Sequence, residues 1–212
     1  ELGIRNVHYH GELSQKNEYK NIRGLMKNPA KCILCNRCTA VCREVQSIEA
    51  IVPTMRGFKT VISSPSKCIT CGQCIQVCPT GALIQEDNTF QVEKLLADPT
   101  KFVVVNTAPA VRVSLGDEFN YPAGADVTKK MVASLRELGF DKVFDTNFGA
   151  DLTIMEEATE FIERYKSGKN LPLITSCCPG WVKFIESFYP ELLNLPSSCK
   201  SPTEMFGAIV KS

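Results

Sequence analysis

Two copies of one cysteine spacing constrain this chain more than any other feature. Residues 32–42 read CILCNRCTAVC and residues 68–78 read CITCGQCIQVC, so each copy has the form C-x2-C-x2-C-x3-C. Thiolates are soft ligands, and three of them at this spacing can wrap one corner-sharing cube of iron and sulfide. The fourth cysteine of each copy lies one helical turn later and points toward the other cube. The repeat therefore predicts two 4Fe-4S clusters.

Crossed ligation divides the eight cysteines into two sets, each with three from one copy and one from the other. The predicted sets are Cys32, Cys35, Cys38 and Cys78 for one cluster, and Cys42, Cys68, Cys71 and Cys74 for the other. Two structural zinc ribbons are the alternative, but zinc ribbons use pairs of cysteines rather than triplets plus one. The copies differ in that Pro79 follows the second and Arg43 follows the first. This difference changes the turn chemistry and not the number of ligands.

The composition is that of an ordinary folded protein and excludes several classes. The 212 residues are 44% hydrophobic and carry 24 Lys and Arg against 23 Asp and Glu. Binding to nucleic acid needs a basic excess that this balance lacks, so we expect no nucleic-acid partner. No apolar run approaches the roughly 20 residues of a membrane span, and no signal-peptide pattern begins the chain. We therefore expect a soluble, cytoplasmic protein.

Strand and helix patterns alternate in the second half of the chain. Residues 90–99 predict a short helix and linker. Apolar runs typical of buried strands cover residues 101–109, 141–148 and 171–176. Helical spacing of apolar residues covers 125–140, 150–168 and 180–189. This alternation predicts an α/β fold with a parallel sheet. The predicted domains are a linker segment at 1–30, an α+β ferredoxin-like two-cluster domain at 31–89, and an α/β domain at 90–212.

Ligands of parallel sheets lie beyond the carboxyl ends of the strands. Three predicted loops meet that condition: TAPA at 107–110, TNFGA at 146–150 and TSCC at 175–178. Cys177 and Cys178 thus lie where Pro179 opens a helix, and backbone amides at a helix start favour negative charge such as a thiolate. Neighbouring side chains in such a turn point in different directions, so the two cysteines need not do the same job. No G-x-G-x-x-G follows a strand, and His8 and His10 are expected in a solvated loop.

Several motifs together resemble those of the iron-only (FeFe) hydrogenases. They are TSCCPGW, TIMEEATEF, FDTNFGAD and KSPTEMFG, with the two ferredoxin-type copies upstream, and the resemblance runs from about Lys31 to the last residue. In that family the active centre, the H-cluster, is a 4Fe-4S cube bridged to a diiron unit that carries CO, cyanide and a dithiolate. The resemblance implies that Cys178 ligates the cube. It also implies that Cys177 binds no metal and is the first proton donor, beside the amine of the dithiolate.

The resemblance further assigns a proton route and a lining for the diiron unit. The route consists of Glu157, Glu160, Arg164 and Ser197, and the lining includes Pro109 and Ala110. On a helix with about 100° per residue, Glu157, Glu160 and Arg164 fall within roughly 60° of one another. A solvated stripe with an ordinary i,i+4 ion pair is the alternative. We favour function for Glu157, which has apolar neighbours, and expect Cys199 to be a packing residue because it lies outside the family motifs.

Two later motifs of that family, of the types MPC…K and E-x-M-x-C-x-x-G-C, do not occur in this sequence. Cys178 is then the only ligand of the H-cluster cube present. We expect the amino-terminal part of a hydrogenase, inactive alone and completed by the remaining part of the hydrogenase. The expected partners are H2 and protons, with either ferredoxin or an NAD-linked flavoprotein as the electron partner. The motif CREVQ resembles hydrogenase subunits that work with NAD-linked flavoproteins. The alternatives are a hydrogenase-like iron–sulfur assembly protein, which usually lacks the first cysteine of the CC pair, and a plain two-cluster electron carrier.

Overall fold

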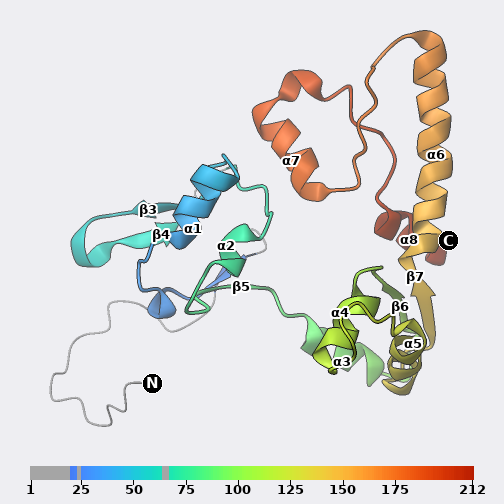
Figure 1. Cartoon of the computed structure of the whole chain (residues 1–212), viewed down its shortest axis with the longest axis horizontal. Helices are drawn as coiled ribbons and strands as arrows, with labels where there is room; N and C mark the ends of the chain where they lie inside the picture. Colours follow the sequence, from blue (N-terminus) through green and yellow to red (C-terminus); the bar gives the residue numbers. More distant parts are fainter. Residues whose placement is uncertain (1–19, 23–24, 64–66) are drawn as a thin grey trace. The chain divides into compact units, whose positions relative to one another are not determined.

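The computed structural model of the chain describes residues 20–22, 25–63 and 67–212 (Figure 1). The chain divides into two compact units, Glu1–Asp87 and Asn88–Ser212. The boundary lies close to the predicted start of the second domain at residue 90. His8 and His10 lie outside the described residues. No helix in the described ranges is long and apolar enough to cross a membrane.

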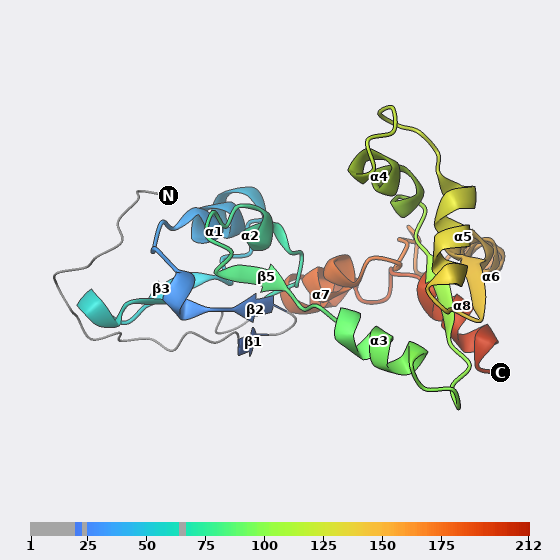
Figure 2. The same ribbon diagram turned by 90° about the horizontal axis from the view of Figure 1, so that it is seen from below.

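The first unit contains a three-stranded antiparallel sheet in the order β1-β2-β5. Its strands are Lys20–Ile22, Leu25–Lys27 and Leu83–Gln85. Figure 2 shows β2 between β1 and β5. The prediction of a linker over residues 1–30 is therefore wrong for β1 and β2. The side chains of Leu25 and Lys27 are buried on either side of Met26, so β2 has the period-two burial of a strand with one face on the core.

The remaining elements of the first unit carry the two cysteine copies and a hairpin. The helices α1 and α2, Arg37–Ala40 and Gln73–Gln76, begin at equivalent positions of the two copies. A wider helical turn, η2 at Val41–Val45, extends α1. The antiparallel strands β3 and β4, Val52–Thr54 and Val61–Ser63, form the hairpin around η3 at Gly57–Lys59. The short helix η1 covers Pro29–Lys31.

The second unit begins with α3 at Thr89–Leu96 and contains a parallel pair of strands. The strands β6 and β7 span Val104–Thr107 and Lys142–Asp145 and pair in register from Val104 opposite Lys142 to Thr107 opposite Asp145. The helices are α4 at Val111–Glu118, α5 at Thr128–Glu137, α6 at Thr146–Ser167, α7 at Pro179–Phe188, η4 at Pro190–Leu192 and α8 at Pro202–Val210. Two of the three expected strands and the three expected helices thus occur, whereas α4 and α8 were not predicted.

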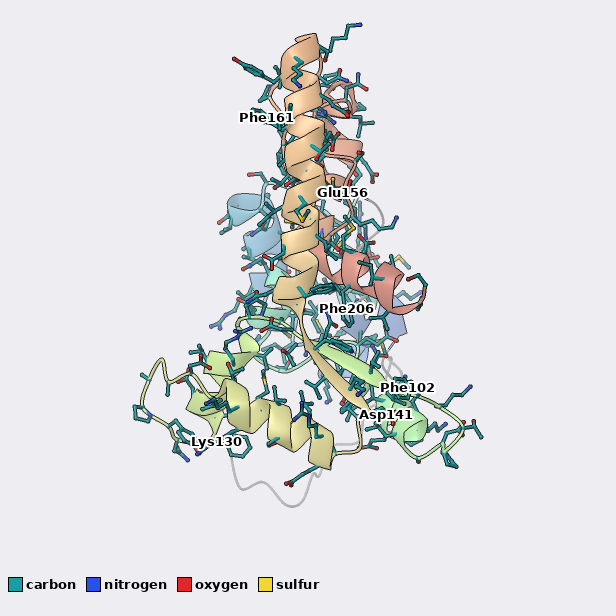
Figure 3. All side chains as sticks on the ribbon, turned by 90° about the vertical axis from the view of Figure 1, so that its right-hand side faces the viewer. Phe102, Lys130, Asp141, Glu156, Phe161 and Phe206 are labelled. Carbon is teal, nitrogen blue, oxygen red and sulfur yellow. The ribbon has the colours of Figure 1, made fainter. Side chains whose placement is uncertain are left out.

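The helix α6 follows β7 without a loop (Figure 3). The Asp145 carboxylate accepts from the Asn147 amide at 2.9 Å and caps the helix. Gly168 ends α6 in the left-handed conformation, as the sequence predicts. The start of α6 lies four residues before the predicted one, because the cap is part of the strand end.

The predicted third strand over residues 171–176 is wrong. This segment makes only an isolated parallel bridge between Ile174 and Pro196. Two hydrogen bonds hold the bridge: the Ile174 amide donates to Leu195 O at 3.1 Å, and the Ser197 amide donates to Ile174 O at 2.7 Å. Pro172, two residues before Ile174, has no N–H to donate, which limits extension of the ladder on that side of the bridge.

The contact between α6 and α8 fixes the segment that precedes α8. A Cβ atom on Gly149 of α6 would lie 2.1 Å from the carbonyl oxygen of Pro202, so only glycine permits this approach. The rings of Phe144 and Phe206 lie 5.2 Å apart (Phe206 is labelled in Figure 3). The Thr153 hydroxyl donates to Gly149 O at 2.9 Å and contacts Lys200 O at 3.4 Å. Residues 196–201 are consequently held along one side of α6.

Candidate functional site

Four cysteines of the first unit surround one cavity with an empty volume of about 390 Å³. They are Cys32, Cys35, Cys38 and Cys78, three from the first copy and one from the second. The rest of the wall is largely apolar, with Ile33, Ile62 and Leu83 among its side chains, and it also includes the buried Lys27. This grouping is the one that crossed ligation requires for the first cluster.

The other four cysteines surround a second cavity, with an empty volume of about 340 Å³. They are Cys42, Cys68, Cys71 and Cys74, one from the first copy and three from the second. Leu25, Ile48 and Ile51 lie in its wall and are buried. Four thiols around a void walled by apolar side chains are a donor set suited to a soft iron–sulfur cluster.

The two cysteine loops repeat the same backbone conformation. Leu34 and Asn36 of the first copy have positive φ, and so do Thr70 and Gly72 at the equivalent positions of the second. Alternation of right- and left-handed residues turns successive N–H groups toward one concavity, an arrangement that binds anions such as iron–sulfur clusters. The repetition in conformation as well as in sequence indicates that both loops have the same task.

Burial makes several of these thiols hard to ionise in the metal-free protein. It raises the pKa of Cys38, and it raises the pKa of Cys74 to about 12, with Cys68 and Cys71 contributing further. For Cys78 burial also acts to raise the pKa, but hydrogen bonds from the backbone at Leu83, Thr80 and Ala82 and from the Thr80 side chain outweigh it and lower the pKa. Thiolates are needed to bind iron, so cluster binding releases protons and compensates the buried negative charge.

Within the described residues, no group of three or more His, Cys, Asp or Glu side chains is arranged to hold a single metal ion. Thiolates around a cube bind separate iron atoms, so they need not converge on one point. The fit to iron–sulfur clusters rests on the two cavities and the two repeated loops.

In the second unit, Cys177 and Cys178 lie where the sequence predicts, before the first turn of α7. Cys178 is the N-cap residue, Pro179 occupies the first helical position, and both cysteines are exposed. The Ser176 hydroxyl donates to Cys199 O at 3.0 Å, which ties this turn to the segment before α8.

Pro109 and Ala110 lie between β6 and α4, and both are exposed. Ala110 is the N-cap residue of α4. Near the carboxyl ends of β6 and β7, Arg112 of α4 forms an ion pair with Asp145 at 2.8 Å, and the Asn106 side chain donates to the Thr146 hydroxyl at 2.9 Å. The predicted loop TAPA therefore follows a real strand end.

Glu160 of α6 is the centre of a hydrogen-bond network that joins three of the predicted residues. Its Oε1 accepts from Arg164 at 2.6 Å, and its Oε2 accepts from the Ser197 hydroxyl at 2.9 Å. The Ser198 amide donates to Oε2 at 3.1 Å, and the Cys199 thiol lies 3.8 Å from the same oxygen. The interpretation of Glu160 and Arg164 as a solvated surface pair is thus wrong.

Arg164 anchors this network to the chain that precedes α8. Besides the carboxylate, its guanidinium donates to the carbonyl oxygens of Leu195 at 2.8 Å, Pro196 at 2.9 Å and Asn194 at 3.2 Å. The side chains of Glu160 and Arg164 are only 18% and 13% exposed. Burial acts to raise the pKa of Glu160, but the donors Ser197, Ser198 and Arg164 outweigh it and hold the pKa below its usual range.

The rest of the predicted route is less closely connected. Glu157 lies on the same edge of α6 and is half-buried, and it makes no hydrogen bond or ion pair within the described part of the chain. Nor is there a hydrogen bond there between Cys177 and any of Glu157, Glu160 and Ser197. Sequence reasoning missed Ser198 and Cys199, because a backbone N–H and a residue outside the motifs give no pattern that could find them. The expectation that Cys199 only packs is wrong, since its thiol reaches the Glu160 carboxylate.

Residues 101–212 match the family described as iron only hydrogenase large subunit, C-terminal domain. The chain belongs to the iron-only hydrogenase family. Residues 31–82 match the 4Fe-4S dicluster domain, so the first unit of this family member is an iron–sulfur cluster domain.

Curated relatives and solved structures of the iron-only hydrogenases are similar to this chain. It is 44% identical to NADP-reducing hydrogenase subunit HndD of Solidesulfovibrio fructosivorans, over 100% of this chain and 38% of that protein. It is 45% identical to iron hydrogenase 1 of Clostridium pasteurianum, over 93% of this chain and 36% of that protein. An apo variant of the FeFe-hydrogenase HydA1 from Chlamydomonas reinhardtii matches with a TM-score of 0.57 and 46% identity, over 60% of this chain and 33% of that chain.

The chain thus spans less than two fifths of the length of these curated relatives. Cytosolic Fe-S cluster assembly factors are also similar, over a smaller part of the chain. One of them, narfl of Xenopus tropicalis, is 39% identical over 53% of this chain and 24% of that protein.

Proposed function

We propose that these residues are the electron-input part and the first catalytic segment of an iron hydrogenase, which interconverts H2 with protons and electrons. The first unit holds two 4Fe-4S clusters in crossed ligation, and Cys178 supplies one ligand of the H-cluster cube. The proposal rests on the division of eight cysteines between two cavities. The first cavity has three cysteines from the first copy and one from the second, and the second cavity has one from the first copy and three from the second.

Crossed ligation gives the first unit its role in electron transfer. Because each copy contributes to both cavities, the two clusters lie on either side of shared backbone, and the walls of both cavities are largely apolar. An apolar wall excludes water from the cluster and shields its sulfur atoms, which is one of the ways in which proteins set cluster potentials. The unit is thus suited to pass electrons between an external partner and the catalytic unit.

The second unit supplies proton transfer and ligation. When bound, the H-cluster supplies the iron chemistry that splits and forms H2. Cys177 is exposed at the turn before α7 and is available to give and take a proton, while its neighbour Cys178 binds iron. Glu157 and Glu160, one helical turn apart, continue the route along α6, and Arg164 and Ser197 hold the Glu160 carboxylate. Pro109 and Ala110, at the end of β6, line the diiron unit.

The electron partner is ferredoxin or an NAD(P)-linked flavoprotein. HndD, a relative over the whole of this chain, is named as a subunit of an NADP-reducing hydrogenase, which favours the nucleotide-linked flavoprotein. The partner is tested by mixing the reduced candidates with the oxidised chain and following cluster bleaching by stopped-flow absorbance. Reduction by ferredoxin alone would remove the flavoprotein from the proposal.

The proposal is tested by anaerobic reconstitution with iron and sulfide. The 212-residue chain should bind about eight iron atoms, four per cube, and should neither evolve nor oxidise H2. The same residues, completed by the remaining part of the hydrogenase and matured with its diiron unit, should evolve H2 from a reduced dye. Four or fewer iron atoms per chain, or robust activity of the 212 residues alone, would contradict the proposal.

An iron–sulfur assembly factor is the second candidate, favoured by the similarity to the cytosolic factors. The presence of Cys177 disfavours it, because the resemblance drawn from the sequence places a proton donor at this position and the assembly proteins usually lack that cysteine. A plain two-cluster carrier is disfavoured by the second unit, Asn88–Ser212, which such a carrier does not need. Transfer of a cluster from the reconstituted chain to an apo-protein acceptor would support assembly instead of hydrogen chemistry.

A further inference from the structure

Cys199 lies at a junction between two parts of the second unit that the proposed proton route needs. Its carbonyl oxygen accepts from the hydroxyl of Ser176, the residue before Cys177, at 3.0 Å. Its amide donates to the Ser197 hydroxyl oxygen at 3.1 Å, and its thiol lies 3.8 Å from Glu160 Oε2. One residue thus contacts the turn of the paired cysteines, the serine and the carboxylate.

We propose that Cys199 is a positioning residue that orients the Glu160 carboxylate and the Ser197 hydroxyl for proton transfer. The inference rests on the proposed function for its role in hydrogen chemistry. The contacts themselves stand without it.

The two oxygens of the carboxylate have different partners. Oε1 accepts from Arg164 at 2.6 Å, whereas Oε2 faces the loop and accepts from Ser197 at 2.9 Å and from the Ser198 amide at 3.1 Å. The Cys199 thiol is a third donor to Oε2. Among the described residues, Ser197 and Cys199 are the only ones whose side chains donate to this oxygen. A partial rotation of the carboxylate that turned Oε2 away from the loop would break the thiol contact.

Cys199 also fixes the direction of the serine hydroxyl. The Ser197 oxygen accepts from the Cys199 amide, so its own hydrogen is left to point to Glu160. A hydroxyl that receives a proton on one side and gives one on the other is a relay only when both directions are set. The Cys199 amide occupies one lone pair of the Ser197 oxygen without giving up its own proton, which leaves the second lone pair to receive a proton and the hydroxyl hydrogen directed to Glu160. The Cys199 thiol holds that acceptor in place.

Thiol S–H groups are weak donors, so the effect of the side chain is modest and measurable. Loss of a donor to an ionised carboxylate disfavours the ionised form. Cys199→Ala should therefore raise the pKa of Glu160 by roughly half a unit, and Cys199→Ser should restore a donor. Ser134→Ala, at a hydroxyl on α5 that donates to Lys130 O at 3.0 Å, is the control.

The first readout needs no hydrogen chemistry and uses the 212-residue chain with reconstituted clusters. The infrared difference between wild type and Cys199→Ala isolates one S–H stretching band. That band should lie at the lower frequency of a hydrogen-bonded thiol and should rise as Glu160 is protonated at acid pH. A band at the frequency of a free thiol that does not change with pH would overturn the proposal.

The second readout is the pH profile of H2 oxidation by the completed hydrogenase, in which Glu160 must be ionised to accept a proton. Cys199→Ala should move the acid limb upward by roughly half a pH unit, while Cys199→Ser and Ser134→Ala leave it near the wild-type position. Equal limbs in all four proteins would overturn the positioning role. An inactive completed enzyme whose S–H band still titrates would contradict the proposed function and support the contact.

Discussion

Gly149→Ala tests whether the close approach of α6 and α8 maintains the second unit. The alanine Cβ would lie 2.1 Å from Pro202 O, whereas real Cβ contacts below 3.0 Å are essentially never seen, so α8 must move by about 0.9 Å. The obstacle is backbone, and the next contacts are Pro202 C at 3.0 Å and Phe206 Cβ at 3.3 Å, so no flexible side chain can yield.

The expected free-energy change follows from two opposing terms. Alanine in place of glycine inside a helix contributes about 1 kcal/mol in favour of folding. Overpacking against backbone costs about 3 kcal/mol, the upper end of the usual range. The net loss of about 2 kcal/mol corresponds to a fall in the urea midpoint of about 1.5 M for a unit of this size.

Gly207→Ala is the matched control. Gly207 lies in the partner helix α8, and a Cβ there would meet nothing within 4 Å. The same substitution therefore keeps the helix-propensity gain without the overlap, and its urea midpoint should equal or exceed that of the wild type.

The assay is anaerobic urea unfolding followed by tryptophan fluorescence. The chain has 1 tryptophan. It is Trp181 of α7, so the signal reports the second unit and not the cluster domain. Coincidence with near-ultraviolet circular dichroism checks that the transition is two-state. A Gly149→Ala midpoint equal to the wild type, or an equal fall in Gly207→Ala, would refute the argument from the helix contact.

Three other perturbations have expected outcomes. Arg164→Ala leaves the Glu160 carboxylate and four carbonyl oxygens without their donor, so it should destabilise the second unit by about 3 kcal/mol in urea. Ser134→Ala removes an exposed side-chain hydrogen bond in the same unit and should change its stability by less than about 0.5 kcal/mol; equal effects of the two substitutions would contradict the network. The pKa of Glu160 is depressed in the folded protein, so the ionised carboxylate stabilises the fold above the unfolded value of 4.5, and this stabilisation is lost as the pH falls through the folded pKa. Glu160→Gln should therefore flatten the pH dependence of the urea midpoint, followed by Trp181 fluorescence, in this acid range. An unchanged slope would contradict the role of the Glu160 carboxylate in stability. Cys78→Ser removes a ligand from the first cavity. Iron analysis and electron paramagnetic resonance should therefore show loss of the cluster in the first cavity and retention of the cluster in the second. Loss of the second cluster instead would show that Cys78 belongs to the other ligand set.

The sequence predicts this molecule well where the relevant interactions are local. The cysteine copies group correctly into two cavities because ligand spacing within a tight loop is a local property. The apolar runs at β6 and β7 and the helix end at Gly168 are local in the same sense. Strands as short as β1 and β2 carry no periodic signal, and α4, with valines and Gly116 in a polar sequence, lacks a clear apolar stripe.

The misses in the candidate site have a different cause. The third strand depends on pairing between residues near 174 and 196, and an apolar run by itself does not reveal whether a partner segment extends that pairing. Glu160 gains Ser198 and Cys199 as partners because the chain that precedes α8 returns to α6. Such contacts depend on tertiary packing, and part of the donor set is backbone, which has no sequence signature.

The different tasks of Cys177 and Cys178 are the central claim, and one comparison tests it most directly. In the completed and matured hydrogenase, each cysteine is replaced with alanine, and the infrared CO and cyanide bands are recorded beside iron content and turnover. Cys177→Ala should keep the bands and the iron but lose at least about 100-fold in turnover, because it removes a proton donor and not a ligand. Cys178→Ala should lose the bands and part of the iron, because it removes a thiolate from the cube. Loss of the bands in Cys177→Ala with retention in Cys178→Ala would contradict the account.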